Sequence, residues 1–183
     1  ANRTSVTVAN TGLTYSVGAV TVNGGNRSAQ FSGTNSTVTD FISRQFSTQS
    51  GTVYFSLLYR TNNPTTEEDF VQIGFSNTTG EPKASLGTAG VVSGTAPSKF
   101  FVRCPAGTGG NSFTGIDLVP STTYFVVGKV SKSTGGNYDT ISLFLNPSTV
   151  TEPTADRTKV GDTGISNFTN FMIRTARLEN TDA

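Results

Sequence analysis

Apolar and polar residues alternate along most of this chain, in short runs separated by turn residues. A period of two places successive side chains on opposite faces of an extended strand, so each run predicts a β-strand with one buried face. No segment of useful length repeats apolar residues at helical spacing. The runs that predict strands are 3–10, 13–22, 37–46, 52–60, 69–77, 89–93, 99–103, 123–131, 139–146 and 166–179.

Two of these runs, 52–60 and 69–77, show the alternation most clearly. The first leaves Tyr54 and Arg60 on its outer face, and the second leaves Gln72 there. The residues that the alternation assigns to the core are Val53, Phe55, Leu57, Tyr59, Val71, Ile73 and Phe75. The first two runs, 3–10 and 13–22, are expected to pair with each other around a turn.

The strongest hairpin signal lies between residues 123 and 146. Its two runs flank the loop KSTGGNY, which is too long for a two-residue turn but rich in glycine. Residues 147–164 carry two prolines and are polar, which predicts a loop. About ten to twelve strands at short spacing, with no helices between them, predict an all-β domain. The expected solution is a two-sheet antiparallel jelly-roll sandwich.

Composition agrees with this fold class and excludes two functional classes. Ser and Thr make up more than a quarter of the chain and there are 20 Gly, residues that favour strands and turns over helices. The formal net charge is only +1 and no basic block occurs, which argues against nucleic-acid binding. No apolar run approaches the roughly 20 residues of a membrane-spanning helix.

The chain contains one cysteine, Cys104, and no histidine. A single cysteine excludes an intrachain disulfide, and Cys104 is expected to be a small buried hydrophobe. An interchain bridge and a metal ligand are the alternatives. The absence of histidine removes the commonest general base and the commonest zinc ligand.

Several stretches resemble the concanavalin A-like, laminin-G-like jelly-roll domains of secreted bacterial proteins. They are TYFVVGKVS with the following YDTISLFLNP and TEPTAD, the earlier SGTVYFSLLYR, and the later FMIRTARLE. The resemblance spans roughly residues 45–180. It implies a concanavalin A-like sandwich and an extracellular or cell-surface location. It does not imply one function, because lectins, adhesins, glycan-binding modules, glucanases and lyases all use this sandwich.

The chain departs from that family at its end. Members continue, after the segment matching RLENTDA, into a strand similar to Phe-Asp-Glu-Ile-Arg-Ile that pairs near the N-terminal strand, whereas this chain ends at Ala183. We therefore expect one domain over residues 1–183 that lacks a terminal strand, as a natural variant, a processed fragment or a subunit completed by another chain. A neighbour's strand could satisfy the unpaired edge.

The segment EEDFVQ, residues 67–72, resembles the Glu-x-Asp-x-x-Glu motif of laminarinase-type retaining glucanases on this fold. In that motif the first carboxylate is the nucleophile and the last is the general acid. Glu67 and Asp69 match the first two positions, but Gln72 stands where the acid should be. Because an amide cannot protonate a leaving group, an enzyme is not expected.

No cofactor is predicted, although this fold often carries a structural calcium ion. The carboxylates that could serve as hard oxygen ligands, on predicted loops or strand ends, are Asp117, Asp139, Asp156 and Asp162. No Asp-x-Asp-x-Asp loop gathers them. A calcium site therefore stays an open alternative.

Candidate ligand-binding residues come from the outward strand positions and, for Asn137 and Tyr138, from the hairpin loop. Sugars bind aromatic faces and planar polar groups, and the absence of Trp counts against a strong lectin platform. The candidates are Tyr54, Arg60, Gln72, Arg103, Asn137 and Tyr138. Phe70, Phe101 and Phe144 are also expected on outer faces, where each needs a cover from a loop, a further domain or another subunit, and they favour an interface.

Three function classes follow from these observations. The first is a non-catalytic extracellular module that binds a glycan or another cell-surface polymer, or mediates adhesion. The second is a structural or assembly subunit of a surface layer or filament, completed by strand sharing with another copy or chain. The third and least favoured is a polysaccharide-active glycosidase or lyase, because acid–base groups are so few.

Overall fold

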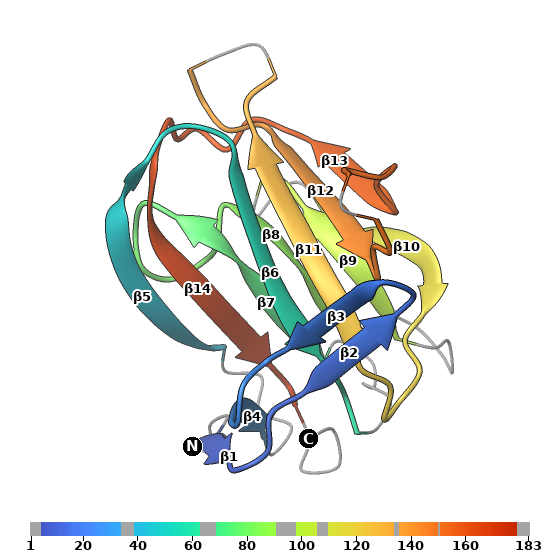
Figure 1. Cartoon of the computed structure of the whole chain (residues 1–183). Helices are drawn as coiled ribbons and strands as arrows, with labels where there is room; N and C mark the ends of the chain where they lie inside the picture. Colours follow the sequence, from blue (N-terminus) through green and yellow to red (C-terminus); the bar gives the residue numbers. More distant parts are fainter. Residues whose placement is uncertain are drawn as a thin grey trace.

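Antiparallel β-strands stacked in layers form the regular structure of this protein (Figure 1). The computed structural model describes residues 5–33, 39–62, 69–90, 98–105, 110–133, 136–149 and 151–178. Within these ranges there are 14 strands and no helix, and hence no helix that could cross a membrane. The strands are β1 (Ser5–Ala9), β2 (Thr14–Val17), β3 (Val20–Asn23), β4 (Ser28–Ser32), β5 (Asp40–Gln49), β6 (Val53–Tyr59), β7 (Phe70–Ser76), β8 (Ala84–Ala89), β9 (Lys99–Arg103), β10 (Ser112–Asp117), β11 (Tyr124–Ser131), β12 (Thr140–Leu145), β13 (Arg157–Val160) and β14 (Phe168–Ala176).

Two large sheets form the layers of a sandwich-like arrangement. One sheet has six strands in the order β10-β9-β8-β7-β14-β5, and the other has four in the order β13-β12-β11-β6. The remaining strands form two separate ribbons, β1–β4 and β2–β3. The predicted all-β class and its antiparallel sheets are therefore confirmed.

The core lies between the two large sheets, where their apolar faces meet. Val71, Ile73 and Phe75 of β7 are 7%, 3% and 4% exposed, so the predicted inward face of this strand is confirmed. Phe55 of β6 packs edge-on against Phe75 across the layers, with ring centroids 5.0 Å apart. Opposite Phe55, a Cβ at Gly128 of β11 would collide with the phenylalanine ring, so glycine is required there. Alternation thus placed the core of both sheets correctly.

The predicted strands 123–131 and 139–146 correspond to β11 and β12, which pair with each other. Two other predictions are wrong. The run 13–22 is two strands, because Gly18 adopts a positive φ of 57° and turns the chain between β2 and β3. The segment 147–164, predicted as a loop, contains β13, which pairs with β12 as an edge strand despite its polar sequence.

Correspondingly, β1 does not pair with the run that follows it. Its partner is β4, with Val6 opposite Phe31. Of the strand expected over 89–93, Ala89 is the last residue of β8, Gly90 lies in no strand, and residues 91–93 lie outside the described part of the chain. The turn at Gly18 explains the first difference, because it gives β2 a closer partner.

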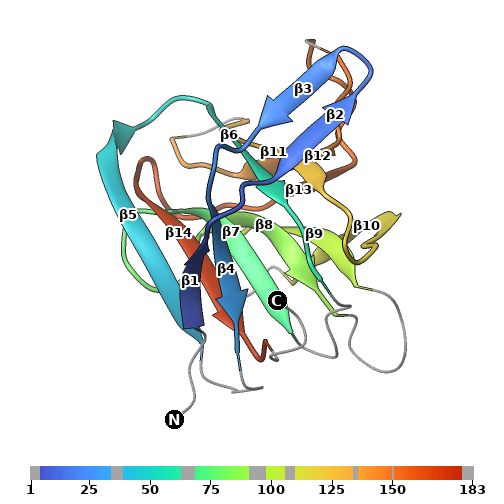
Figure 2. The same ribbon diagram turned by 60° about the horizontal axis from the view of Figure 1, so that its bottom comes forward.

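The two ribbons pack at different places on the sandwich. The β2–β3 hairpin crosses the outer face of the four-stranded sheet, where Tyr15 packs 5.9 Å from the Phe125 ring (Figure 1). The β1–β4 ribbon lies instead over the inner side of the six-stranded sheet, beside β6 (Figure 2). A Cβ at Gly33, just after β4, would collide with the carbonyl group of Leu178, so the ribbon passes close to the end of β14.

Candidate binding face

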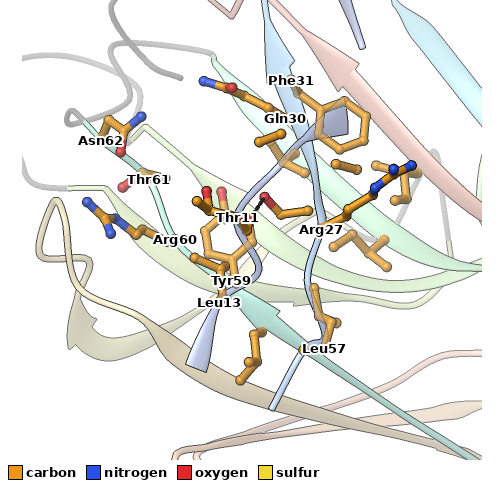
Figure 3. A pocket seen from close by; sticks show the side chains of 18 of the residues that line it. Thr11, Leu13, Arg27, Gln30, Phe31, Leu57, Tyr59, Arg60, Thr61 and Asn62 are labelled. Atoms are coloured by element: carbon orange, nitrogen blue, oxygen red, sulfur yellow. Dashed lines mark hydrogen bonds between the residues drawn. The ribbon is translucent and has the colours of Figure 1, made fainter. Parts of the chain in front are cut away.

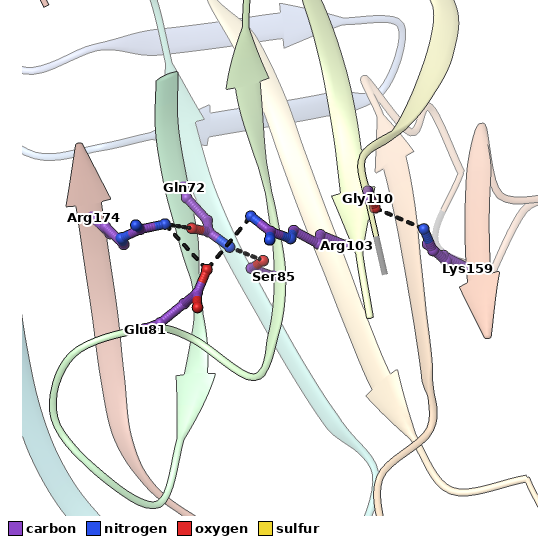
Figure 4. A network of polar contacts seen from close by, with 7 residues as sticks. All are labelled: Gln72, Glu81, Ser85, Arg103, Gly110, Lys159 and Arg174. Carbon is purple, nitrogen blue, oxygen red and sulfur yellow. Dashed lines mark hydrogen bonds and ion pairs between the residues drawn. The ribbon is translucent and has the colours of Figure 1, made fainter. Parts of the chain in front are cut away.

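Polar side chains gather on the outer face of the six-stranded sheet, which points away from the core. Gln72 of β7 pairs with Arg174 of β14 on one side, and Ser85 of β8 pairs with Arg103 of β9 in the neighbouring row. Glu81, from the loop between β7 and β8, reaches over both rows (Figure 4). We call these five residues the arginine face.

A continuous hydrogen-bond network joins the arginine face. The Gln72 amide donates to the Ser85 hydroxyl at 2.6 Å and accepts from Arg174 at 3.1 Å. Arg174 also donates to a Glu81 carboxylate oxygen at 3.2 Å, and Arg103 lies 3.4 Å from the same oxygen. Two guanidinium groups therefore share one carboxylate, which leaves the face with an excess of positive charge.

One polar atom of this network, the Nε donor of Arg103, is buried without a hydrogen-bond partner among the described residues. Burial lowers the pKa of Arg174, and Arg103 lowers it further, while Glu81 opposes the change. Arginine stays charged in any such setting. Both guanidinium groups of the arginine face therefore carry positive charge.

Glycine makes the close packing of this face possible. Gly87 of β8 pairs with Gln72, and a Cβ there would collide with the carbonyl oxygen of Val71 on β7. A Cβ at Gly74 would collide with the carbonyl oxygen of Ala84 in the same way. Without these glycines, β7 and β8 could not approach each other as they do.

The structure brings together only two of the six predicted ligand-binding residues, Gln72 and Arg103. Tyr54 lies on the outer face of the four-stranded sheet, where its hydroxyl donates to Glu152 at 2.6 Å. Arg60 follows β6 and lines a pocket on another side of the molecule. Asn137 is partly buried, with its amide 3.5 Å from Asp162. The six residues therefore do not form one site.

The expected exposure of Gln72 and Tyr138 is wrong. Gln72 does point outward, but it is only 1% exposed because Arg174 and the Glu81 loop cover it. Tyr138 is 0% exposed. Its ring stacks on Phe168 with centroids 4.0 Å apart, and its hydroxyl donates to the carbonyl of Gly51 at 2.5 Å. Tyr138 is a core residue that sequence reasoning mistook for a loop residue.

The outward phenylalanines also find their cover within the chain. Phe101 is 2% exposed and packs against Phe113 of β10, 6.1 Å away, and Phe144 is 4% exposed. The Arg174 guanidinium lies over the ring of the half-buried Phe70, 5.0 Å from its centroid. The suggestion that Phe101 and Phe144 mark an interface is therefore wrong.

Sequence reasoning missed Arg174 and Glu81. Arg174 carried a usable signal, because alternation along β14 places it on the face opposite to Phe171 and Ile173. No sequence signal pointed to Glu81, because it lies in a loop whose path the alternation does not constrain. Asp69 of the EEDFVQ segment is buried at 1% exposure, and Glu67 lies outside the described residues.

The carboxylates considered for calcium have protein partners. Asp139 accepts from the backbone N–H of Ser133 at 2.9 Å, and Asp156 accepts from that of Leu145 at 2.7 Å. Asp162 accepts from Gly164, and Asp117 pairs with Lys99. In the described ranges no three His, Cys, Asp or Glu side chains gather in a way that could hold a metal ion.

Cys104 is buried at 0% exposure, as expected. Its thiol donates to the carbonyl of Gly161 at 2.9 Å. Burial raises its pKa to about 12, with the negative charges of Asp139 and Asp162 adding to the effect. Such a thiol is a poor nucleophile and is out of reach of a second chain.

A pocket of about 650 Å³ opens beside β6 (Figure 3). Its floor is apolar and includes Leu57, Val71 and Ile173, whereas its rim carries Arg27 and Arg60. In Figure 3 the two arginines lie on opposite sides of the pocket.

No protein-family model matches the chain, and the search of curated proteins finds no match. The resemblance to concanavalin A-like domains thus stays a prediction from the residues.

Proposed function

We propose that this protein is a non-catalytic module of the concanavalin A-like jelly-roll type, located outside the cell or on its surface, that binds a glycan on the arginine face. The observation that carries the proposal is the convergence of planar polar groups there. An amide, two guanidinium groups and a carboxylate lie within one hydrogen-bond network, from Gln72, Arg103, Arg174 and Glu81.

Sugar hydroxyl groups donate and accept at once, so they suit a surface that offers both kinds of partner. The side chains of Arg103 and Arg174 are each 20% exposed and that of Glu81 is 31% exposed. The exposed atoms of these three side chains can therefore contact a ligand, while contacts with the sheet hold their buried atoms in place. A preorganised set of this kind loses little side-chain entropy when it binds.

The arrangement of strands supports the jelly-roll assignment. β14 lies between β7 and β5, and β11 lies between β12 and β6, so strands distant in the sequence are neighbours in both sheets. Such crossovers between two antiparallel sheets are typical of jelly rolls. The assignment also agrees with the family resemblance of residues 45–180.

A second candidate function is that of an assembly subunit, favoured by the edge strand β5. This strand is ten residues long, pairs only with β14 among the described strands, and exposes Phe41 by 48%. A long edge with exposed apolar side chains is a ready template for another chain. A polysaccharide-active enzyme has the least support, since the Gln72 amide cannot act as a general acid.

Glycan binding can be tested by isothermal titration against a panel of neutral and acidic oligosaccharides. The proposal expects at least one ligand whose affinity falls about tenfold in Arg103→Ala, which corresponds to about 1.4 kcal/mol. Lys99→Ala is the matched control, because Lys99 lies on the same strand but pairs with Asp117. If the whole panel shows no binding, or if both variants behave alike, the proposal fails.

A further inference from the structure

The two large sheets are unequal, so β6 lies at an edge of the four-stranded sheet where no described strand pairs with its outer side. β6 ends the four-stranded sheet and pairs only with β11 among the described strands. The facing sheet has six strands, of which β14 and β5 continue past the point where the four-stranded sheet ends (Figure 1). One edge of β6 therefore presents backbone N–H and C=O groups that no described strand pairs.

Two hollows with largely apolar floors lie beside this edge. The pocket of about 650 Å³ has Leu57 and Tyr59 of β6 on one side and Phe31 of β4 on the other. A smaller hollow of about 100 Å³ is lined by Ile42, Ser43 and Arg44 of β5 together with Phe171 and Ile173 of β14. Because Ile173 lines both, we treat them as one feature, the β6 trough.

The floor of the β6 trough is core surface that the four-stranded sheet does not cover and that the β1–β4 ribbon covers only in part. Ile42 of β5 pairs with Ile173 of β14 in the six-stranded sheet, and both side chains point toward the inner face of that sheet. Ile42 nevertheless stays 43% exposed, and Ile173 is only partly buried. An apolar strip on the inner side of a sandwich is normally covered by a strand of the facing sheet.

The charge of the β6 trough and one buried hydroxyl group indicate which kind of polypeptide segment would bind there. Arg27, Arg44 and Arg60 line the trough, and none of its lining residues is acidic. None of the ion pairs formed by described residues involves these arginines. At the end of β6, Thr61 is 5% exposed and its hydroxyl has no partner there. The trough thus offers positive charge and a hydrogen bond to an incoming segment.

We propose that the β6 trough accepts an extended strand from another polypeptide, with apolar residues at alternate positions and carboxylates at the others. The strand pairs with the free edge of β6, and the apolar side chains cover Ile42 and Ile173. The carboxylates pair with the arginines of the rim, which accounts for positive charge around an apolar floor. This interaction is separate from glycan binding, because the arginine face lies on the opposite side of the six-stranded sheet.

The test uses the peptide acetyl-Val-Asp-Ile-Glu-Val-Asp-Ile-amide, titrated into the isotopically labelled chain and followed by NMR. Binding should shift the amide resonances of β6 and protect them from hydrogen exchange. One control peptide carries proline at its centre, which removes a ladder hydrogen bond. In another, lysine replaces every acidic residue. The proposal requires both controls to bind about tenfold more weakly or not at all.

Variants of the chain locate the site. Ile42→Asp and Arg60→Glu should each weaken the acidic peptide about tenfold. Val160→Asp, at a residue that is 65% exposed on β13, should have no effect. Because Arg60 is exposed, its variant keeps the fold even if Ile42→Asp does not.

Three results would overturn the assignment. They are equal binding of the proline peptide, peptide binding that Arg60→Glu leaves unchanged, and no shift of the β6 amides at millimolar peptide. Sedimentation distinguishes a further case. A dimer of this chain that Arg60→Glu dissolves would make the occupant a second copy and would also overturn the assignment to a different polypeptide.

Discussion

The arginine face and the β6 trough lie on opposite sides of the same sheet, and they differ in what covers them. On the arginine face the β7–β8 loop brings Glu81 over the sheet, so the outward residue Gln72 is 1% exposed. At the trough the four-stranded sheet ends at β6, and the inward residue Ile42 of β5 is 43% exposed. An outward polar side chain is thus buried, whereas an inward apolar one meets solvent.

This comparison separates two determinants of burial. Alternation decides toward which face of a strand a side chain points. The number of strands in the facing sheet, and the course of the loops, decide whether that face is covered. Buried polar groups need hydrogen bonds, which the network of the arginine face supplies to Gln72, whereas exposed apolar surface such as that of the trough favours a partner.

The largest expected effect is a difference in thiol reactivity between the closed core and the trough. Burial raises the pKa of Cys104 to about 12 from the ordinary value of 9.0, so near neutral pH its thiolate is about a thousandfold scarcer. In Ile42→Cys the new thiol would lie in the trough and should react with iodoacetamide at the rate of a free cysteine. Mass spectrometry of the labelled peptides distinguishes the two sites.

The same pKa gives a pH dependence. Because folding raises the pKa of Cys104, its contribution to stability is fully present below pH 9 and is lost as pH rises toward about 12. Cys104→Ala should flatten the alkaline fall of the unfolding free energy. Rapid labelling of Cys104 in the native state would show that this part of the core is open.

The next effect concerns side-chain packing, compared between the closed core and the β6 trough. Phe75 contacts four other rings, of Phe46, Phe55, Phe168 and Phe171, and Phe75→Ala should cost about 3–5 kcal/mol. Ile173→Ala at the trough should cost only about 1–2 kcal/mol, because part of its side chain is already in water. Urea unfolding monitored by circular dichroism measures both. Equal costs would mean that the trough is closed in solution.

Removing one arginine from each region gives a smaller contrast. Arg174→Met deprives the buried Gln72 carbonyl oxygen of its donor and should cost about 1–3 kcal/mol. Arg60→Met, the matched change at the trough, should lie within about 0.5 kcal/mol of the parent because Arg60 is exposed. Comparable losses in thermal unfolding would contradict this account of the arginine face.

The sequence was sufficient to predict the all-β class, the inner faces of β6 and β7 and the hairpin of β11 with β12, because each rests on local alternation. It also placed Gln72 and Arg103 on outer faces, where the sheet register then brings them into one network. It could not bring in Glu81, whose position depends on a loop. It misplaced Tyr138, because a residue beside a glycine-rich loop is core here through its stacking on Phe168.

The smallest expected effect lies on the outer face of the four-stranded sheet, away from both the arginine face and the β6 trough. There Lys129 and Tyr54 donate hydrogen bonds to Glu152, and these lower the pKa of its carboxyl below the ordinary value of 4.5. The stability that this gives is present above pH 4.5 and is lost as pH falls through the lowered pKa. Because Glu152 is exposed, solvent screens the interaction and the effect on the free energy of unfolding should be slight.

An NMR titration of the Glu152 carboxyl should show its pKa rising toward 4.5 in Lys129→Ala. The control variant Lys132→Ala removes a hydrogen bond to the Ser166 carbonyl and should leave the pKa of Glu152 unchanged. A Glu152 pKa that stays unchanged in Lys129→Ala would mean that the pair of Lys129 with Glu152 is not formed in solution.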